Sequence, residues 1–480
     1  MLPSQTGPIL NVKPDSPHIL LVNPWIHDFA AYDFWAKPVG LLTLASILDC
    51  HGFTVSYIDC LDRFHPKGPQ TDPHARYGRG PYLKTQIPKP EGLEDVPRNF
   101  CRYGIKPEWF REELLAISRV DLVLITSFMT YWSPGVRETI GWIRQVFPNT
   151  PVVLGGIYAS LCFDHASRFS RADKVVSGPG EKCILQLAEE YTGFSSRPGV
   201  DSNGFTPDDI NTYPYPAFHL QRKIAYIPII TSKGCPFSCA YCASHLLNPN
   251  RDLRTPDLVV EEITYWHKKY GVKDFVFYDD ALLVDAERSA VPIFEGIIKC
   301  GLKVRFHTPN AVHIREISKK TASLMSKAGF KTLRLGLETA EFEGRKEFDI
   351  KVTANEFKQA VSCLIEAGFQ KHQIGAYLLV GLPGQRIESI EESIKIVNES
   401  GLLPVLANYS PIPQTELWQR AVLSSRYDLE SDPIFTNNAI FPCQREDFSW
   451  KTITHLKQLA NRNTNPKTAS ALPGFGDILH

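Results

Sequence analysis

The chain has 480 residues, of which 43% are hydrophobic and 22% charged, and its 52 basic and 52 acidic side chains give a formal net charge of +0. This balance excludes the strongly basic character typical of proteins that bind nucleic acids or anionic membranes. The sequence shows no secretory signal and no apolar run long enough to span a membrane, and its 11 cysteines are too few for a disulfide scaffold. We therefore expect a cytoplasmic protein of two or three domains.

Short apolar runs alternate with helical stretches over residues 1–200. This alternation predicts an α/β fold, a Rossmann-like, doubly wound and mostly parallel sheet, interrupted by a Pro-, Gly- and Arg-rich insertion at about 64–107. The expected strands are 17–25, 53–59, 120–131, 150–156 and the start of 172–191, and the expected helices are 39–51, 134–147 and the rest of 172–191. Ligands of such folds bind beyond the carboxyl ends of the strands.

A second strand-helix series follows a linker, residues 201–224, that is rich in Pro, Asp and Asn. Six strands are expected in this series, at 226–232, 273–280, 303–309, 331–339, 373–381 and 402–411. The helices between them open on capping residues and close at glycines, so we predict a partial (β/α)6 barrel of the TIM type over 225–415. Residues 416–480 are interpreted as a small C-terminal cap with a poorly ordered tail.

Three cysteines fall within eight residues, just past the first strand of this second series: Cys235, Cys239 and Cys242. A free cysteine is often only a small core residue, but a loop opened by Gly234 and Pro236 is not a core face. A structural zinc site needs four ligands, and His245 is the one residue nearby that could complete it. Thiolates also ligate iron-sulfur clusters, where three ligands for four irons leave one iron open to a substrate. We favour the cluster and keep zinc as the alternative.

The segment "CPFSCAYC" resembles the Cys-x3-Cys-x2-Cys loop of the radical S-adenosylmethionine (SAM) superfamily, including the aromatic Tyr241 before the last cysteine. The resemblance extends over about 225–413. It implies that the three cysteines hold a [4Fe-4S] cluster whose open iron binds the amino and carboxylate groups of SAM. It also implies that an electron from a donor such as flavodoxin or ferredoxin splits SAM to give a 5'-deoxyadenosyl radical.

The later strand ends resemble the same family. The SAM contacts that the resemblance implies are Tyr241, Asp279, Asp280, Asn310, Arg334, Glu338, Val380 and Gly381. Asp279 and Asp280 stand where the family contacts the amino group of SAM, but the usual Gly-Gly-Glu is absent, so their individual roles stay open. Glu338 would contact the ribose, and the backbone around Val380 and Gly381 the adenine. The alternatives are that the aspartates cap the next helix, that Glu338 is a solvated turn residue and that "GLPGQ" is only a turn.

Residues 1–200 resemble the cobalamin-binding module that precedes the radical domain in a large subfamily. The segments "VVLGG" and "LITSF" supply the implied cobalamin contacts: Ser127, Gly155 and Gly156. The glycines would leave room for the nucleotide tail. His27 does not lie in the Asp-x-His-x-x-Gly motif of other cobalamin proteins, so we interpret it as a loop histidine. Three aromatic residues either line a ligand pocket or pack ordinarily: Trp25, Tyr32 and Trp35. The alternative for the whole sheet is a docking domain without cobalamin.

The two resemblances together imply cobalamin-dependent methylation of an unactivated carbon. Rearrangement, cyclisation and sulfur insertion stay open, as does a non-catalytic cobalamin or redox sensor or a zinc-stapled scaffold. The substrate can be a small molecule, a tetrapyrrole, a lipid or a peptide, and we assign no catalytic side chain beyond the cofactor contacts. We expect no nucleic-acid partner.

Overall fold

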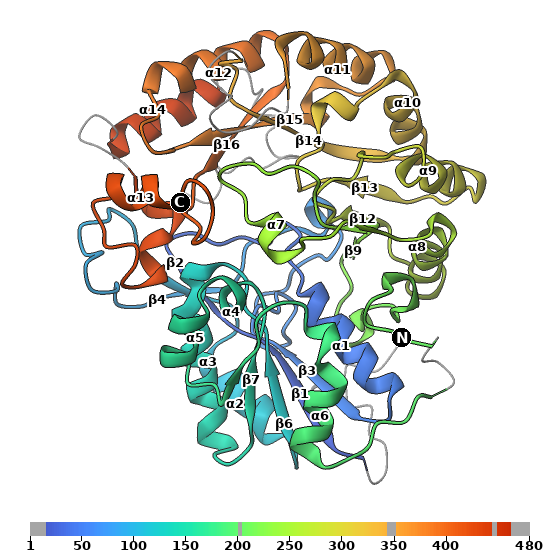
Figure 1. Cartoon of the computed structure of the whole chain (residues 1–480), viewed down its shortest axis with the longest axis vertical. Helices are drawn as coiled ribbons and strands as arrows, with labels where there is room; N and C mark the ends of the chain where they lie inside the picture. Colours follow the sequence, from blue (N-terminus) through green and yellow to red (C-terminus); the bar gives the residue numbers. More distant parts are fainter. Residues whose placement is uncertain (1–15, 200–203, 343–351, 444–448, 462–480) are drawn as a thin grey trace. The chain divides into compact units, whose positions relative to one another are not determined.

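The computed structural model of the protein describes residues 16–199, 204–342, 352–443 and 449–461. The chain divides into two compact units (Figure 1): unit 1 consists of Met1–Ala225 with Glu430–Phe435, and unit 2 of Tyr226–Leu429 with Thr436–His480. Within the described ranges, no helix combines the length and the apolar character that crossing a membrane requires.

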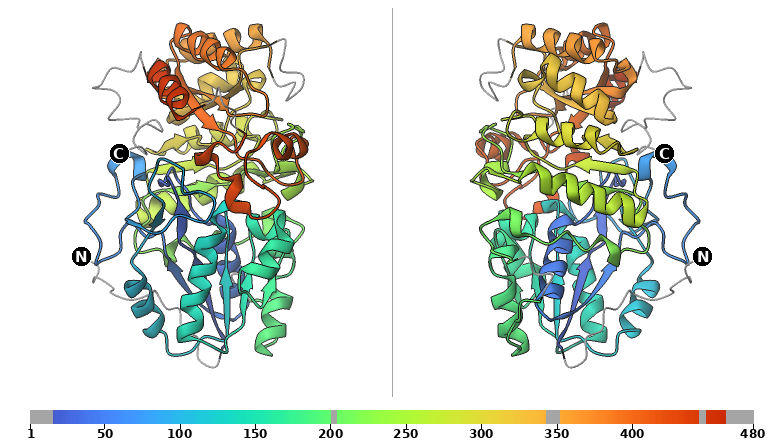
Figure 2. Two further views of the ribbon diagram at one scale, coloured as in Figure 1. Left: turned by 90° about the vertical axis from the view of Figure 1, so that its left-hand side faces the viewer. Right: turned by 90° about the vertical axis from the view of Figure 1, so that its right-hand side faces the viewer.

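Unit 1 is built on a five-stranded parallel sheet with the strand order β3-β1-β6-β7-β8. Its strands are β1 (His18–Asn23), β3 (Thr54–Asp59), β6 (Leu122–Ile125), β7 (Val152–Leu154) and β8 (Lys174–Val175). Helices lie on both sides of the sheet (Figure 2): α1 (Val39–Cys50), α2 (Pro107–Leu115), α3 (Ser133–Val146), α4 (Ile157–Leu161), α5 (Phe163–Phe169) and α6 (Ile184–Thr192). Burial on both faces explains why "ILLV" of β1 is continuously apolar. The predicted fold class is confirmed for this unit.

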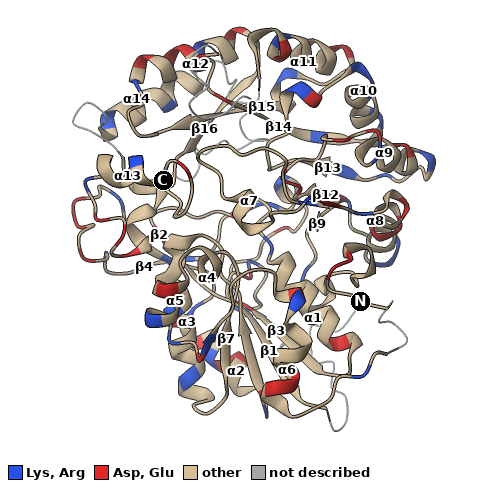
Figure 3. Cartoon of the chain, in the orientation of Figure 1, with Lys and Arg blue, Asp and Glu red and all other residues tan. Residues whose placement is uncertain are grey.

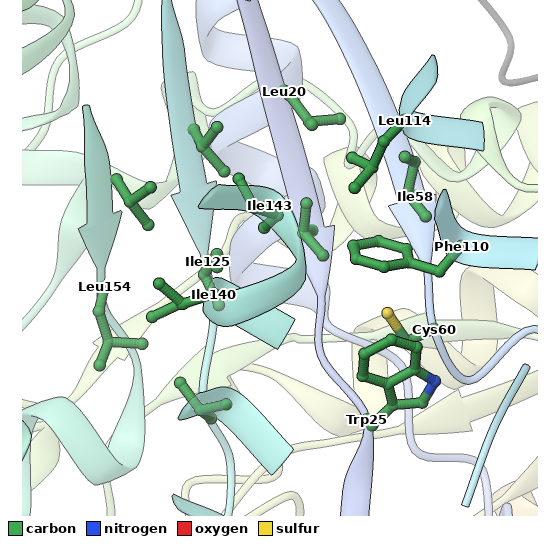
Figure 4. Packing of buried hydrophobic residues seen from close by; sticks show 14 of the residues in the cluster. Leu20, Trp25, Ile58, Cys60, Phe110, Leu114, Ile125, Ile140, Ile143 and Leu154 are labelled. Atoms are coloured by element: carbon green, nitrogen blue, oxygen red, sulfur yellow. The ribbon is translucent and has the colours of Figure 1, made fainter. Parts of the chain in front are cut away.

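One core cluster of unit 1 lies between the sheet and helices α2 and α3 (Figure 4). Trp25 is only 1% exposed, and its ring meets that of Phe110 edge-on with the centroids 4.9 Å apart. The indole N–H of Trp25 donates to the carbonyl of Ile105 at 2.7 Å, which satisfies its one polar group. Trp25 therefore packs in the core of unit 1.

The predicted insertion contains β4 (Lys84–Gln86) and β5 (Cys101–Tyr103), which the sequence analysis missed. They form an antiparallel three-stranded sheet, in the order β2-β5-β4, with β2 (Ile26–Asp28), which lies outside the insertion and was also missed. Each strand has three residues, which is too short for an alternating pattern to stand out from the surrounding Pro and Gly. The expected linker also has fixed contacts in unit 1, since Ser46 donates to the carbonyl of Tyr215 at 2.7 Å.

Unit 2 is built on six parallel strands in the order β16-β15-β14-β13-β12-β9. These are β9 (Ile227–Ile229), β12 (Asp274–Phe277), β13 (Arg305–His307), β14 (Phe330–Glu338), β15 (Ile374–Val380) and β16 (Leu403–Asn408). The main helices between them are α8 (Pro256–Tyr270), α9 (Ala290–Lys299), α10 (Lys319–Ala328), α11 (Ala354–Glu366) and α12 (Ile387–Glu399). All six predicted strands are present, in the sequential order of a partial (β/α)6 barrel.

Local signals explain where these helices begin and end. Ser318 and Thr353 form capping boxes at the starts of α10 and α11, and α8 begins at Pro256 and ends at Gly271 in the left-handed conformation. Figure 3 shows charges of both signs interspersed along the outer helices α10, α11 and α12, as expected for a solvated face.

The C-terminal residues add α13 (Trp418–Ser424) and α14 (Trp450–Asn461) to unit 2. Helix α14 packs against α12 and β16, and the side-chain amide of Asn398 donates to the carbonyl of Leu459 at 3.3 Å. The poorly ordered tail of the sequence analysis falls largely on residues 462–480, which lie outside the described residues. The short segment Glu430–Phe435 belongs to unit 1, where Asp432 Oδ2 lies 3.8 Å from His165 Nε2.

Candidate functional site

The three cysteines lie in a loop that a small ladder closes. β10 (Ser232–Lys233) pairs antiparallel with β11 (Asp252–Leu253), so the segment between them returns to its starting point. Gly234 opens the loop at φ +81°, and a Cβ there would stand 2.2 Å from the carbonyl oxygen of Asn250. Only glycine fits this position, because both the backbone conformation and the close approach exclude a side chain.

The thiols are partly covered inside this loop. Cys239 is buried, whereas Cys235 and Cys242 are half-buried, and the N–H of Cys242 donates to the carbonyl of Cys239 at 3.0 Å. Among the residues that the structure describes, no three His, Cys, Asp or Glu side chains gather around one point that could hold a single metal ion. The assignment of the three cysteines as cluster ligands therefore stays a prediction.

Asp279 holds the beginning of the loop. Its Oδ1 accepts four hydrogen bonds, two from the backbone and hydroxyl of Thr231 (3.0 and 2.7 Å) and two from those of Ser232 (2.6 and 2.8 Å). The carboxyl is 2% exposed, and within the described chain its Oδ2 has no hydrogen-bond partner. Burial outweighs the four donors and raises the pKa of Asp279 to about 6.

Asp280 holds the end of the same loop. The hydroxyl of Ser244 donates to Asp280 Oδ2 at 2.5 Å, and the N–H of Ser244 donates to the sulfur of Cys242 at 3.4 Å. Ser244 is also the first residue of the short helix α7 (Ser244–Leu247). The next long helix, α9, begins only at Ala290 with Ser289 as its cap residue, so neither aspartate caps it.

Of two further predicted SAM contacts, Asn310 follows β13 and Arg334 lies within β14. The amide of Asn310 donates to the carbonyl of Tyr278 at 2.8 Å, next to the two aspartates in the chain. Arg334 is buried within β14 and donates to the carbonyl of Leu333 at 3.0 Å. Burial lowers the pKa of this guanidinium, and the hydroxyl of Tyr377 opposes the shift. The structure therefore places a buried cation on β14, two strands away from β12, which the aspartates follow.

Glu338 is the last residue of β14 and has φ +62°, a left-handed conformation that costs a non-glycine residue free energy. The pairing of β14 with β15 shifts register between Gly336 and Glu338. This irregularity turns the end of the strand at the position where the ribose contact is predicted.

The turn after β15 is closed by a residue that the sequence analysis missed. Gln385 Oε1 accepts from the N–H of Gly381 at 2.8 Å, and its amide donates to the carbonyl of Leu379 at 2.8 Å. The carbonyl of Val380 accepts from the N–H of Tyr409 at 2.9 Å. These backbone groups are satisfied within the chain, and a Cβ on Gly381 would lie 3.5 Å from the ring of Phe441.

The predicted cobalamin contacts lie together at the strand ends of unit 1, but they differ in the space that they leave for a ligand. Ser127 donates from its hydroxyl to the carbonyl of Gly155 at 2.7 Å, so it is already engaged. Gly156 has φ +95°, and a Cβ there would lie 2.3 Å from the carbonyl oxygen of Ser127. A Cβ on Gly155 would meet nothing within 4 Å. Gly155 is therefore the position that leaves space, whereas Gly156 is required by the chain itself.

His27 and the remaining aromatic residues have partners within unit 1. His27 Nε2 lies 2.7 Å from Glu138 Oε2, and Arg102 binds the same carboxylate. Burial disfavours the charge on Glu138, but the hydrogen bonds from His27 and Arg102 outweigh it and lower its pKa to about 2. The indole of Trp35 donates to Tyr77, and the hydroxyl of Tyr32 accepts from Arg76. All three lie against other parts of unit 1.

Comparisons with known proteins match most of this architecture. An uncharacterized methyltransferase of Pyrococcus horikoshii is 25% identical over 59% of this chain and 65% of its own length. An anaerobic magnesium-protoporphyrin IX monomethyl ester cyclase of Cereibacter sphaeroides is 27% identical over 59% of this chain and 50% of its own. The chain thus spans between half and two thirds of the length of these curated relatives.

Two solved structures share the fold across both units. The radical S-adenosylmethionine methyltransferase TsrM from Kitasatospora setae, solved with cobalamin and a [4Fe-4S] cluster bound, has a TM-score of 0.61 at 17% identity and covers 86% of this chain and 76% of its own. The cobalamin-dependent S-adenosylmethionine radical enzyme OxsB, solved with aqua-cobalamin bound, has a TM-score of 0.56 at 14% identity and covers 85% and 55%. The model of the Radical SAM superfamily matches residues 229–397. Over these residues, which lie in unit 2, the chain is similar to the radical SAM superfamily.

Proposed function

We propose that the protein is a radical SAM enzyme that binds a [4Fe-4S] cluster, cleaves SAM reductively and uses cobalamin to methylate an unactivated carbon of a small-molecule substrate. The observation that carries this proposal is the cysteine loop, which begins at Gly234, is closed by the β10-β11 ladder and is fixed at both ends by Asp279 and Asp280 at the carboxyl end of β12. A fixed loop of three thiols is the donor set that a cluster with one open iron requires.

We assign two charged residues to the two charged ends of SAM. Asp280 supplies a carboxylate beside Cys242 for the amino group, and Arg334 supplies a buried cation for the carboxylate group. Bound to the reduced cluster, SAM yields a 5'-deoxyadenosyl radical that abstracts hydrogen from carbon. The protein's own part is to hold the two ends of SAM and to keep the loop rigid.

Unit 1 supports cobalamin as the second cofactor. Gly155 leaves open space at the carboxyl end of β7, the edge where doubly wound sheets bind ligands. The solved structures of TsrM and OxsB contain cobalamin, and several curated relatives are named methyltransferases. Relatives named as cyclases favour a second candidate, ring formation on a similar substrate, which differs from methylation in its product mass.

The cellular setting follows from the cofactors. Cluster-ligating thiols require a reducing compartment, so we place the enzyme in the cytoplasm. A low-potential donor such as flavodoxin or ferredoxin supplies the electron.

The first test is anaerobic reconstitution with iron and sulfide, followed by incubation with dithionite and SAM. We expect iron near four atoms per chain and formation of 5'-deoxyadenosine. Cys239→Ala should abolish both, whereas Cys300→Ala, which removes an exposed cysteine after α9, should change neither. Zinc in place of iron, with no 5'-deoxyadenosine from the reconstituted protein, would reject the enzyme and favour a binding protein.

A further inference from the structure

Two consecutive carboxylates at the end of β12 bind opposite ends of the cysteine loop. Asp279 accepts from Thr231 and Ser232, which precede the cysteines, and Asp280 accepts from Ser244, which follows them. Asp279 is buried and accepts four hydrogen bonds through Oδ1, so we interpret it as an anchor for the beginning of the loop. Asp280 is half-buried and accepts from Ser244, which also contacts the last cysteine.

Ser244 connects Asp280 to that cysteine through two separate groups. Its backbone N–H donates to Cys242 Sγ at 3.4 Å, and its hydroxyl donates to Asp280 Oδ2 at 2.5 Å. A hydroxyl-carboxylate distance of this length is typical of a charge-assisted hydrogen bond. Within the described residues, no donor lies on the other oxygen, Asp280 Oδ1.

We propose that Ser244 is a positioning residue that fixes the Asp280 carboxylate beside Cys242, with Oδ1 directed to receive the amino group of SAM. This inference rests on the proposed function. Without the hydroxyl, the Asp280 side chain would occupy several rotamers, and SAM binding would have to supply the lost conformational entropy. The backbone bond from Ser244 to the sulfur does not depend on its side chain, so the loop and its thiols should be unaffected.

The test is the dissociation constant of SAM for the reconstituted, unreduced enzyme, measured by anaerobic equilibrium dialysis, in which no turnover takes place. Ser244→Ala should keep the iron content and melting temperature of the unmodified protein and weaken SAM binding about tenfold, the size expected for one hydrogen bond to a charged group. Ser244→Thr, which keeps the hydroxyl, should bind SAM within about twofold of the unmodified protein. Ser362→Ala is the matched control, because it removes a serine-carboxylate bond, to Glu366, on the exposed face of α11.

A double variant separates positioning from independent effects. If Ser244 acts through Asp280, Ser244→Ala should add little to the loss caused by Asp280→Ala. Unchanged SAM binding in Ser244→Ala, fully additive losses, or loss of iron from Ser244→Ala would each overturn the inference. A failure of the proposed function would be distinguishable from these outcomes, because the unmodified protein would then bind neither the cluster nor SAM. In that case both proposals would be wrong.

Discussion

Burial raises the pKa of Asp279 despite four donors on one carboxylate oxygen, so the contribution of this residue to stability depends on pH. Its pKa is raised from 3.8 to about 6, so between these values the folded state binds a proton that the unfolded state has lost. The stability that Asp279 contributes is therefore fully present below about pH 4 and is lost as the pH rises through about 6. Asp279→Asn, which keeps the accepting oxygen without the charge, should gain about 2–3 kcal/mol relative to the unmodified protein between pH 4 and 7.5.

Chemical denaturation at a series of pH values measures this difference, and Asp274 offers a control of opposite sign. Burial disfavours the charge on Asp274, but hydrogen bonds from His307 and Arg305 outweigh it and lower its pKa. Asp274→Asn should therefore lose stability at neutral pH, and the loss should shrink as the pH falls below the usual aspartate range. A pH-independent difference for Asp279→Asn would contradict the prediction.

The sequence predicted candidate site residues, which stay a prediction, but it did not predict the hydrogen bonds that connect them. Cysteine spacing and strand-end carboxylates brought Cys235 to Cys242, Asp279 and Asp280 together as candidates, because the carboxyl ends of parallel strands share one edge. Ser244 and Gln385 were missed. Ser244 acts on a carboxylate 36 residues away, and Gln385 on the backbone of its own turn, so neither stands out by spacing.

At the level of elements, the cysteine loop depends on a glycine at its first position. Gly234→Ala would put a side chain 2.2 Å from the Asn250 carbonyl in a left-handed conformation, so the β10-β11 ladder should open. We expect iron incorporation to fall several-fold, measured by metal analysis after reconstitution. Gly271→Ala, at the end of α8 with φ +68° and nothing within 4 Å, is the matched control. It should cost about 1 kcal/mol of stability and no iron; equal iron loss in both variants would point to general destabilisation.

Helices and strands were predicted correctly where the sequence repeats a strong hydrophobic pattern. They were missed where pairing between segments distant in the sequence determines whether a strand forms. The six strands of unit 2 are buried apolar runs between capped helices, and all were predicted. The strands β2, β4 and β5 exist because three short segments, separated by up to about 75 residues, supply each other's hydrogen bonds. Local sequence contains no signal for such pairing.

At the level of the whole molecule, each unit consists almost entirely of one continuous stretch of the chain. The sequence did not predict the one exception. Segment Glu430–Phe435 belongs to unit 1 although the residues on both sides belong to unit 2. Asp432 faces His165, and Phe435 lies 3.3 Å from where a Cβ of Gly92 would stand. The position of this segment in unit 1 depends on a few side-chain contacts between residues that are far apart in the sequence. Periodic patterns in the sequence do not predict such contacts.

If each unit holds its own cofactor, the two cofactors should be separable by single substitutions. Gly155→Val adds a side chain whose Cβ meets no atom within 4 Å in the protein, so the fold should tolerate it, but it would fill the space assigned to the nucleotide tail. We expect cobalamin retention, measured by absorbance per chain after reconstitution, to fall about tenfold or more because of overpacking. Iron content and 5'-deoxyadenosine formation should persist, whereas Cys239→Ala should lose iron and retain cobalamin.

Gly40→Val, on α1 and equally open, controls for the added volume. Full cobalamin retention in Gly155→Val would contradict the prediction that the nucleotide tail binds at the carboxyl end of β7. Loss of both cofactors together would show that the two units do not bind their cofactors independently.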